Sequence, residues 1–240
     1  MLYHRDRCVT RRGIIQVFTV AACTLGLAGC NSAPRTIRYR VTLEVETPEG
    51  MRIGSGVSES EMYFNDGALS GLGNAISFGV RAQAIVVDLG ARGLLFMLLT
   101  GDPTRKDSPI EPSYFISTAP WGFVRANGAD EGTPAFYDWL NTYKPKATLA
   151  LERLPMLAHF RNINDPRTVE NVDPRNLAAT FGAGVHLRRA TIEITGDPVT
   201  TGIEKYAPSF GDLSDFNAWY RSLHHGDPRQ FRPEALKEGF

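Results

Sequence analysis

The chain has 240 residues, and its 26 basic and 26 acidic side chains give a formal net charge of zero at neutral pH. This length is sufficient for one domain with a sizeable hydrophobic core. The balanced charge gives no electrostatic reason to expect a nucleic-acid partner, which binds to basic surfaces.

Residues 1–29 have the pattern of a secretory signal peptide. Arginines dominate the first twelve residues, and an apolar run follows from Ile14 to Ala28. The run has about fifteen residues, fewer than the roughly 20 that a membrane-spanning helix needs. The stretch Leu27-Ala28-Gly29-Cys30 that closes it resembles the lipobox of bacterial lipoproteins.

This resemblance implies cleavage between Gly29 and Cys30, a diacylglyceryl group on the Cys30 thiol, and acylation of the new amino terminus with a fatty acid such as palmitate. Two or more acyl chains hold a protein stably on a membrane. Asn31 resembles the sorting signal for the outer membrane, which would place the domain in the periplasm. An ordinary secretory signal with a chance cysteine is the alternative, and Arg11-Arg12 leaves the twin-arginine export route open.

Cleavage would remove four arginines, one aspartate, Cys8 and Cys23, and would leave 22 basic and 25 acidic side chains with a net charge of −3. Because lipid consumes Cys30, the mature chain would hold no disulfide, no catalytic cysteine and no thiolate metal site. It also lacks a polybasic patch for anionic lipid, so attachment would rest on the acyl chains.

The mature chain divides into three predicted parts: a polar tether over residues 30–35, a single β-rich domain over 36–205 and a helical C-terminal extension over 206–240. The fold class we expect is α+β, built mainly from antiparallel β hairpins in a sheet or sandwich-like arrangement, with two or three peripheral helices.

The first hairpin is predicted from alternation. Apolar residues at every second position from Ile37 to Val45 are typical of a half-buried strand. Thr47-Pro48-Glu49-Gly50 has the composition of a turn, and Ile53, Ser55 and Val57 indicate a returning strand.

The most apolar stretches of the mature chain are residues 80–89 and 94–99, joined by Gly90-Ala91-Arg92-Gly93. We expect them to form central strands that are buried on both faces. The glycine-rich residues 65–79 indicate a loop, and residues 114–117 a short strand.

Helix signals follow at Thr133-Pro134, where threonine can cap a helix that Pro145 ends. Its aromatic residues are more typical of core than of a ligand site. Further elements are predicted at the following places: strands over 148–151 and 156–160, a short helix ending at Phe181-Gly182, a strand over 185–195 with a bulge across 188–190, and an amphipathic helix from Asp212 or Ser214 to Leu223.

No motif in the sequence names a reaction. Ser77 lacks the strand-to-helix elbow of a serine hydrolase, and the five Asp-Pro pairs are typical of turns. Two further sets could contribute to a site only if the fold gathers them: the histidines His159, His186, His224 and His225, and the glutamates Glu152, Glu193 and Glu204. We therefore predict no metal and no cofactor, and the catalytic residues remain unassigned.

Several stretches resemble a group of uncharacterised bacterial proteins; these stretches are the hairpin over residues 39–57, Phe160–Val169, Phe181–Val185 and Ile194–Glu204. The resemblance implies a single domain and no mechanism.

The sequence thus predicts a lipid-anchored envelope protein that acts as a binding or accessory module, with the membrane and an envelope protein as partners. The alternative is a periplasmic hydrolase whose site is assembled from distant residues.

Overall fold

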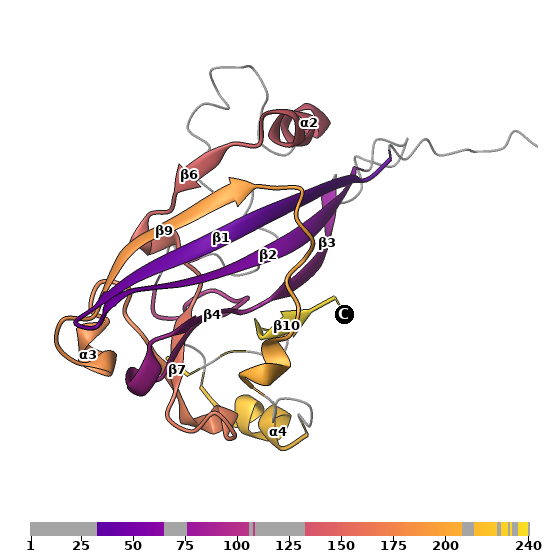
Figure 1. Cartoon of the computed structure of the whole chain (residues 1–240). Helices are drawn as coiled ribbons and strands as arrows, with labels where there is room; N and C mark the ends of the chain where they lie inside the picture. Colours follow the sequence, from indigo (N-terminus) through magenta and orange to yellow (C-terminus); the bar gives the residue numbers. More distant parts are fainter. Residues whose placement is uncertain are drawn as a thin grey trace, which may run out of the picture.

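The computed structural model describes residues 33–64, 76–105, 108, 133–207, 214–224, 227–229, 231 and 235–239. Cys30, the segment before it, residues 65–75 of the expected glycine-rich loop and the strand expected at 114–117 lie outside this description. Residues 76–79 of that expected loop belong to a strand instead. The described residues contain two antiparallel sheets and three α-helices, which confirms the α+β class (Figure 1).

The large sheet has six strands in the order β10-β3-β2-β1-β9-β6. These are β1 (Arg35–Thr47), β2 (Gly50–Phe64), β3 (Ile76–Gln83), β6 (Lys146–Thr148), β9 (His186–Ile194) and β10 (Lys237–Glu238). The small sheet has the order β4-β5-β7-β8, formed by β4 (Ile85–Asp88), β5 (Leu94–Met97), β7 (Leu157–Phe160) and β8 (Val169–Asn171). The helices are α2 (Pro134–Tyr143), α3 (Ala178–Phe181) and α4 (Ser214–Ser222), with short 3-10 turns η2 (Gly90–Arg92), η4 (Leu151–Arg153), η5 (Pro166–Thr168) and η6 (Ile203–Lys205).

The hairpin of β1 and β2 forms as predicted. Every second residue of β1 from Ile37 to Val45 is buried, and the strand pairs with β2 along its whole length. The Thr47 hydroxyl accepts a hydrogen bond from the Glu49 amide and donates one to the Gly50 carbonyl. Gly50 has a φ of 117°, which glycine adopts without the steric cost other residues would meet.

Near the hairpin turn, the face of β2 that packs inward carries glycines, and an apolar residue lies on the outer face. Ile53 is 64% exposed, whereas Gly54 and Gly56 are buried. β4 packs directly against these glycines: a Cβ on Gly54 would lie 2.3 Å from the Val86 carbonyl oxygen, and one on Gly56 would lie 2.9 Å from Ile85 Cγ1. Only the absence of side chains on β2 lets the two sheets approach this closely.

The apolar stretch 80–89 is divided between the two sheets, so the expectation of one continuous strand was wrong. β3 ends at Gln83 in the large sheet and β4 begins at Ile85 in the small one. Between them the Ala84 amide donates to the Leu236 carbonyl. β4 is therefore an edge strand in hydrogen-bonding terms, although β2 covers its face. β5 is a central strand, as expected.

Two apolar clusters meet at the small sheet. The larger includes inward residues of β1 together with Val87, Leu95 and Leu157, so side chains of both sheets share it. Phe96 and Leu98 belong to the second cluster. Because neighbouring residues of β5 enter different clusters, this strand is buried on both faces.

The C-terminal segment covers the second cluster. Phe231 and Leu236 are buried in it, and Trp219 of α4 packs against it. β10 then pairs with β3 at the edge of the large sheet. The predicted amphipathic helix is present, and the same segment also supplies a strand that the sequence reading did not include.

Several local signals of the other elements are confirmed, but the strand expected over 148–151 is wrong, because β6 ends at Thr148 and the 3-10 turn η4 begins at Leu151. The Thr133 side chain accepts a hydrogen bond from the Phe136 amide at the start of α2, and Gly182 ends α3 with a φ of 94°. β9 pairs Arg189 with Glu44 but Leu187 with Val45, which places the expected bulge at Arg188. None of the helices in the described ranges is long and apolar enough to span a bilayer.

Replacing Gly54 by Ala should destabilise the fold by about 1–3 kcal/mol, because the added Cβ meets β4 backbone that can yield only by moving the strand. The matched control is Gly79→Ala in β3, where the nearest heavy atom to the new Cβ is at 3.8 Å, an ordinary contact. Urea unfolding of both variants measures the difference. Equal midpoints for the two variants would contradict the close approach of the sheets.

Candidate functional site

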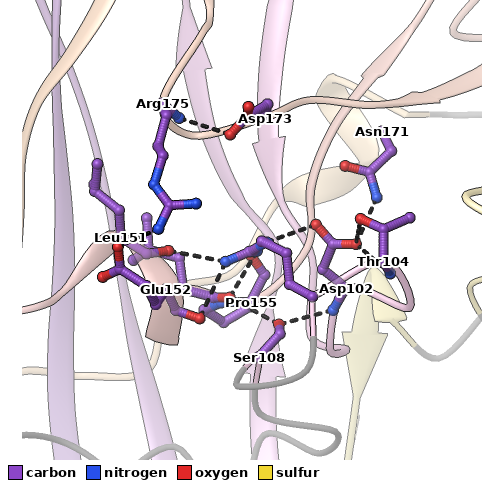
Figure 2. Close-up of polar contacts among 11 residues, drawn as sticks. Asp102, Thr104, Ser108, Leu151, Glu152, Pro155, Asn171, Asp173 and Arg175 are labelled. Atoms are coloured by element: carbon purple, nitrogen blue, oxygen red, sulfur yellow. Dashed lines mark hydrogen bonds and ion pairs between the residues drawn. The ribbon is translucent and has the colours of Figure 1, made fainter.

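A buried polar cluster joins the loop after β5 to η4 and to the end of β8 (Figure 2). At its centre the Arg105 Nε donates to Asp102 Oδ2 at 2.7 Å. Asp102 is 4% exposed, so this ion pair is largely removed from water. Such a group is either a reactive site or a structural link, and the remaining hydrogen bonds decide which.

The Arg105 guanidinium has no donor left for a ligand. Beyond Asp102, it donates to four backbone carbonyls, those of Leu151, Glu152, Leu154 and Pro155, at 2.8–3.3 Å. A guanidinium has five N–H groups in all. The Ser108 hydroxyl donates to the Leu154 carbonyl and accepts from the Asp102 amide, which closes the loop.

The Asp102 carboxylate is equally well satisfied. Its second oxygen accepts from the Thr104 amide and hydroxyl and from the Asn171 side chain. Burial raises the pKa of Asp102, but the hydrogen bonds from Arg105, Thr104 and Asn171 outweigh it and hold the pKa below its ordinary value. A carboxylate held in its charged form with its lone pairs occupied cannot serve as a general acid, so the cluster is structural.

The Asp-Pro pairs form turns, as predicted. In four of them the aspartate Oδ1 accepts the amide of the residue two positions later; these aspartates are Asp102, Asp165, Asp173 and Asp227. Two of these turns, Asp165-Pro166-Arg167 and Asp227-Pro228-Arg229, also fold the arginine back onto its own aspartate. Asp197 differs, since it accepts from the Thr195 hydroxyl and pairs with Arg40.

The histidines within the described residues do not gather. The His159 ring contacts the Leu94 carbonyl at 3.1 Å and packs edge-on against Phe181. His186 is on β9, and His224 lies 3.6 Å from Asp227, whose carboxylate already binds Arg229. Among the described residues there is no group of three metal-ligating side chains.

The three glutamates are also separate, and each binds a cation: Glu152 binds Arg175, Glu193 binds Arg40 and Lys146, and Glu204 binds Lys237. Each pKa is lowered. A backbone amide and Arg175 lower that of Glu152; Arg40 and Lys146 outweigh the effect of burial at Glu193; Lys237 lowers that of Glu204. A general acid needs a raised pKa, so none of these three residues has the surroundings of a general acid.

The hydroxyl groups of Ser77 and Tyr39 could act in catalysis in principle, but their surroundings do not suit that role. Ser77 lies within β3, opposite Tyr63 of β2, so no strand-to-helix elbow surrounds it. Burial raises the pKa of Tyr39 to about 12, with a hydrogen bond from Ser58 acting in the opposite direction. This phenol is therefore neutral at physiological pH.

The outer face of the large sheet carries cross-strand charge pairs. Arg38 and Arg81 both bind Glu59, which is their direct neighbour on β2. Arg189 likewise binds Glu44 across the pair of β9 and β1. Oppositely charged neighbours on a solvated sheet face stabilise it modestly and keep it polar.

An exception lies at the turn end of the hairpin, where Met51 is 48% exposed and Ile53 is 64% exposed on the same outer face. Their partners on β1 are Glu46 and Glu44. We call Met51, Ile53 and the exposed Glu46 the hairpin-end patch. The sequence reading missed it because it predicted a returning strand at Ile53, Ser55 and Val57 without assigning its faces.

Arg92 fixes the loops at this end. It binds the Glu49 carboxylate through two hydrogen bonds, which lower the pKa of Glu49 to about 2. Its third contact is to the Phe181 carbonyl at the end of α3. Three segments far apart in sequence are thereby held together beside the patch (Figure 1).

The opposite end of the hairpin is where the predicted tether joins the fold. Arg35, the first residue of β1, binds Asp138 of α2 at 2.9 Å, and the Asn141 side chain donates to the Thr36 carbonyl at 3.1 Å. Helix α2 is thus attached to the strand that continues from Cys30 (Figure 1).

Comparison with known proteins gives no relative: no family model, no curated protein and no solved structure matches the chain.

Replacing Arg105 by Met should destabilise the protein by about 3–5 kcal/mol, because it leaves the buried Asp102 carboxylate without its cation. Arg161→Met is the control: its pair with Glu170 is exposed, and its loss should cost no more than about 1 kcal/mol. Thermal and urea unfolding report both values. A structural role predicts that the two variants differ, whereas similar small losses would mean that the cluster contributes little.

Proposed function

We propose that this protein is a lipid-anchored component of the cell envelope, held at the outer membrane by acyl chains on Cys30, and that it works by binding another envelope protein. The observation that carries the proposal is the order of the N-terminal signals: basic residues, a short apolar run, and Leu27-Ala28-Gly29-Cys30. The path of the chain after Cys30 supports it.

Only five residue steps separate Cys30 from Arg35, where β1 begins. β1 lies inside the large sheet, with β2 on one side and β9 on the other. An anchor joined to an interior strand is attached to the folded domain itself rather than to a flexible extension. The shared apolar cluster also favours a sandwich-like packing of the two sheets, which we include in the proposal.

The length of β1 gives the domain a direction relative to the membrane. Its 13 residues extend over about 40 Å at roughly 3.3 Å per residue. The hairpin turn therefore lies far from the tether, and the hairpin-end patch lies beside that turn. An exposed apolar pair on an otherwise charged sheet face suits a partner with a small complementary apolar surface.

Replacing Cys30 by Ser should abolish lipidation and release the protein from membranes, because the serine hydroxyl cannot form the thioether. Intact-mass spectrometry of purified protein and membrane fractionation test this. The wild-type chain is expected to carry at least two acyl chains. A soluble wild-type protein without acyl mass would contradict the anchor.

A photo-crosslinking residue placed at Ile53 should capture an envelope protein in living cells, because this side chain is exposed at the proposed binding end. The control is the same residue at Arg161, which is exposed on β7's connecting loop and outside the patch. A product specific to position 53, abolished by Met51→Ser, supports the binding role. Identical products from both positions, or none, would contradict the patch as the binding surface.

A further inference from the structure

We propose that the tether end of the domain rests on the lipid headgroups of the membrane that holds Cys30. The contact surface consists of Trp139 and Tyr143 of α2, which packs on the inner side of the large sheet, and of Tyr63, which is exposed on the outer side near the end of β2. This inference depends on the proposed lipidation, and it adds that the domain has a defined side facing the bilayer. The support comes from the length of the tether, the exposure of the aromatic side chains and the pairing of the charges near them.

The chain itself limits how far this end can lie from the membrane. Five residue steps of at most about 3.6 Å each give a maximal reach of roughly 18 Å between Cys30 and Arg35. Acyl chains hold Cys30 at the membrane surface. Arg35 is bound to Asp138 of α2, so the helix is kept within the same distance range as the tether.

The described residues at this end expose aromatic side chains. Tyr143 is 68% exposed at the last turn of α2, and its ring packs 5.6 Å from that of Trp139, which is only partly buried. Tyr63 is 44% exposed on β2, one residue beyond the partner of Arg35. Tyrosine and tryptophan are enriched where protein meets the headgroup region, because their rings are apolar and their polar tips stay hydrated.

The charges near these rings indicate an aromatic rather than an electrostatic contact. The Arg35 guanidinium is already paired with Asp138, and Lys146 is paired with Glu193. Lys144, at the end of α2, lies near Asp197 and lowers its pKa. Because these described cations lie near carboxylates, the contact should depend on the aromatic rings more than on charge, so binding should resist salt.

The consequence is an orientation. If the tether end lies on the bilayer, β1 leads away from it, and the strand's length lets the hairpin-end patch lie up to about 40 Å from the membrane. A flexible tether alone would let the domain tumble. Contact at a second point removes much of that freedom and keeps the patch accessible to a partner.

The test uses two full-length lipidated proteins, each with one tryptophan, reconstituted in phosphatidylethanolamine–phosphatidylglycerol vesicles that contain lipids brominated near the headgroup. One protein carries Trp121→Phe and Trp219→Phe and reports on Trp139. The control carries Trp121→Phe and Trp139→Phe and reports on Trp219 of α4, which lies at the other end of the view in Figure 1. We expect at least twofold stronger quenching of Trp139, unchanged in 0.5 M salt.

Equal quenching of the two proteins would overturn the inference, and so would loss of the difference in salt. Mass spectrometry of the same samples separates the two proposals: acylated protein with equal quenching refutes only the membrane contact, whereas unacylated protein refutes the anchor. Hydrogen exchange on the wild-type protein avoids any folding defect of the variants. Residues 134–146 should then exchange more slowly in vesicles than in detergent, and residues 214–222 should not change.

Discussion

The close approach of β4 to Gly54 and Gly56 of β2 is the constraint on which the rest of the structure depends. The carbonyl of Val86 occupies the space of the absent side chain at Gly54, and the Ile85 side chain does so at Gly56. The two sheets can therefore share one apolar cluster, and the small sheet can bury its other face under the C-terminal segment. Larger residues on β2 would separate the sheets and expose the apolar edge strand β4, since interiors are packed too densely to absorb a misplaced methyl group.

Beside the cross-strand pairs of the large sheet, several ion pairs of the described residues hold loops in place. Arg105 binds five acceptors in one buried cluster, and Arg92 connects the hairpin turn to the end of α3. Asp-Pro-Arg turns at residues 165–167 and 227–229 close on themselves. The carboxylates in these groups therefore serve to hold loops in place.

The two ends of the long hairpin differ in a way that fits the proposed role. At one end β1 begins, α2 is attached through Arg35, and tyrosines are exposed. At the other end lie the turn, Arg92 and the apolar residues Met51 and Ile53. One strand thus connects the predicted anchor directly to the proposed binding end, and its hydrogen bonds to β2 and β9 make that connection rigid.

The sequence by itself determined the features that depend on residues close together in the chain. Alternation predicted the inward face of β1, Thr47 to Gly50 predicted the turn, and Phe181-Gly182 predicted the end of α3. Each depends on backbone preference or on the period of the apolar residues, and both can be recognised in a short segment. The lipobox prediction is of the same local kind.

Only the tertiary structure decided which face of β2 is buried, because glycines at 54 and 56 have no apolar signal of their own and are read correctly only once β4 lies against them. It also decided the break at Ala84, where β3 of one sheet ends and β4 of the other begins one residue later. The partners of Arg105 and the exposure of Ile53 depend in the same way on residues distant in sequence. Contacts between residues distant in sequence set these features, so no local sequence pattern predicts them.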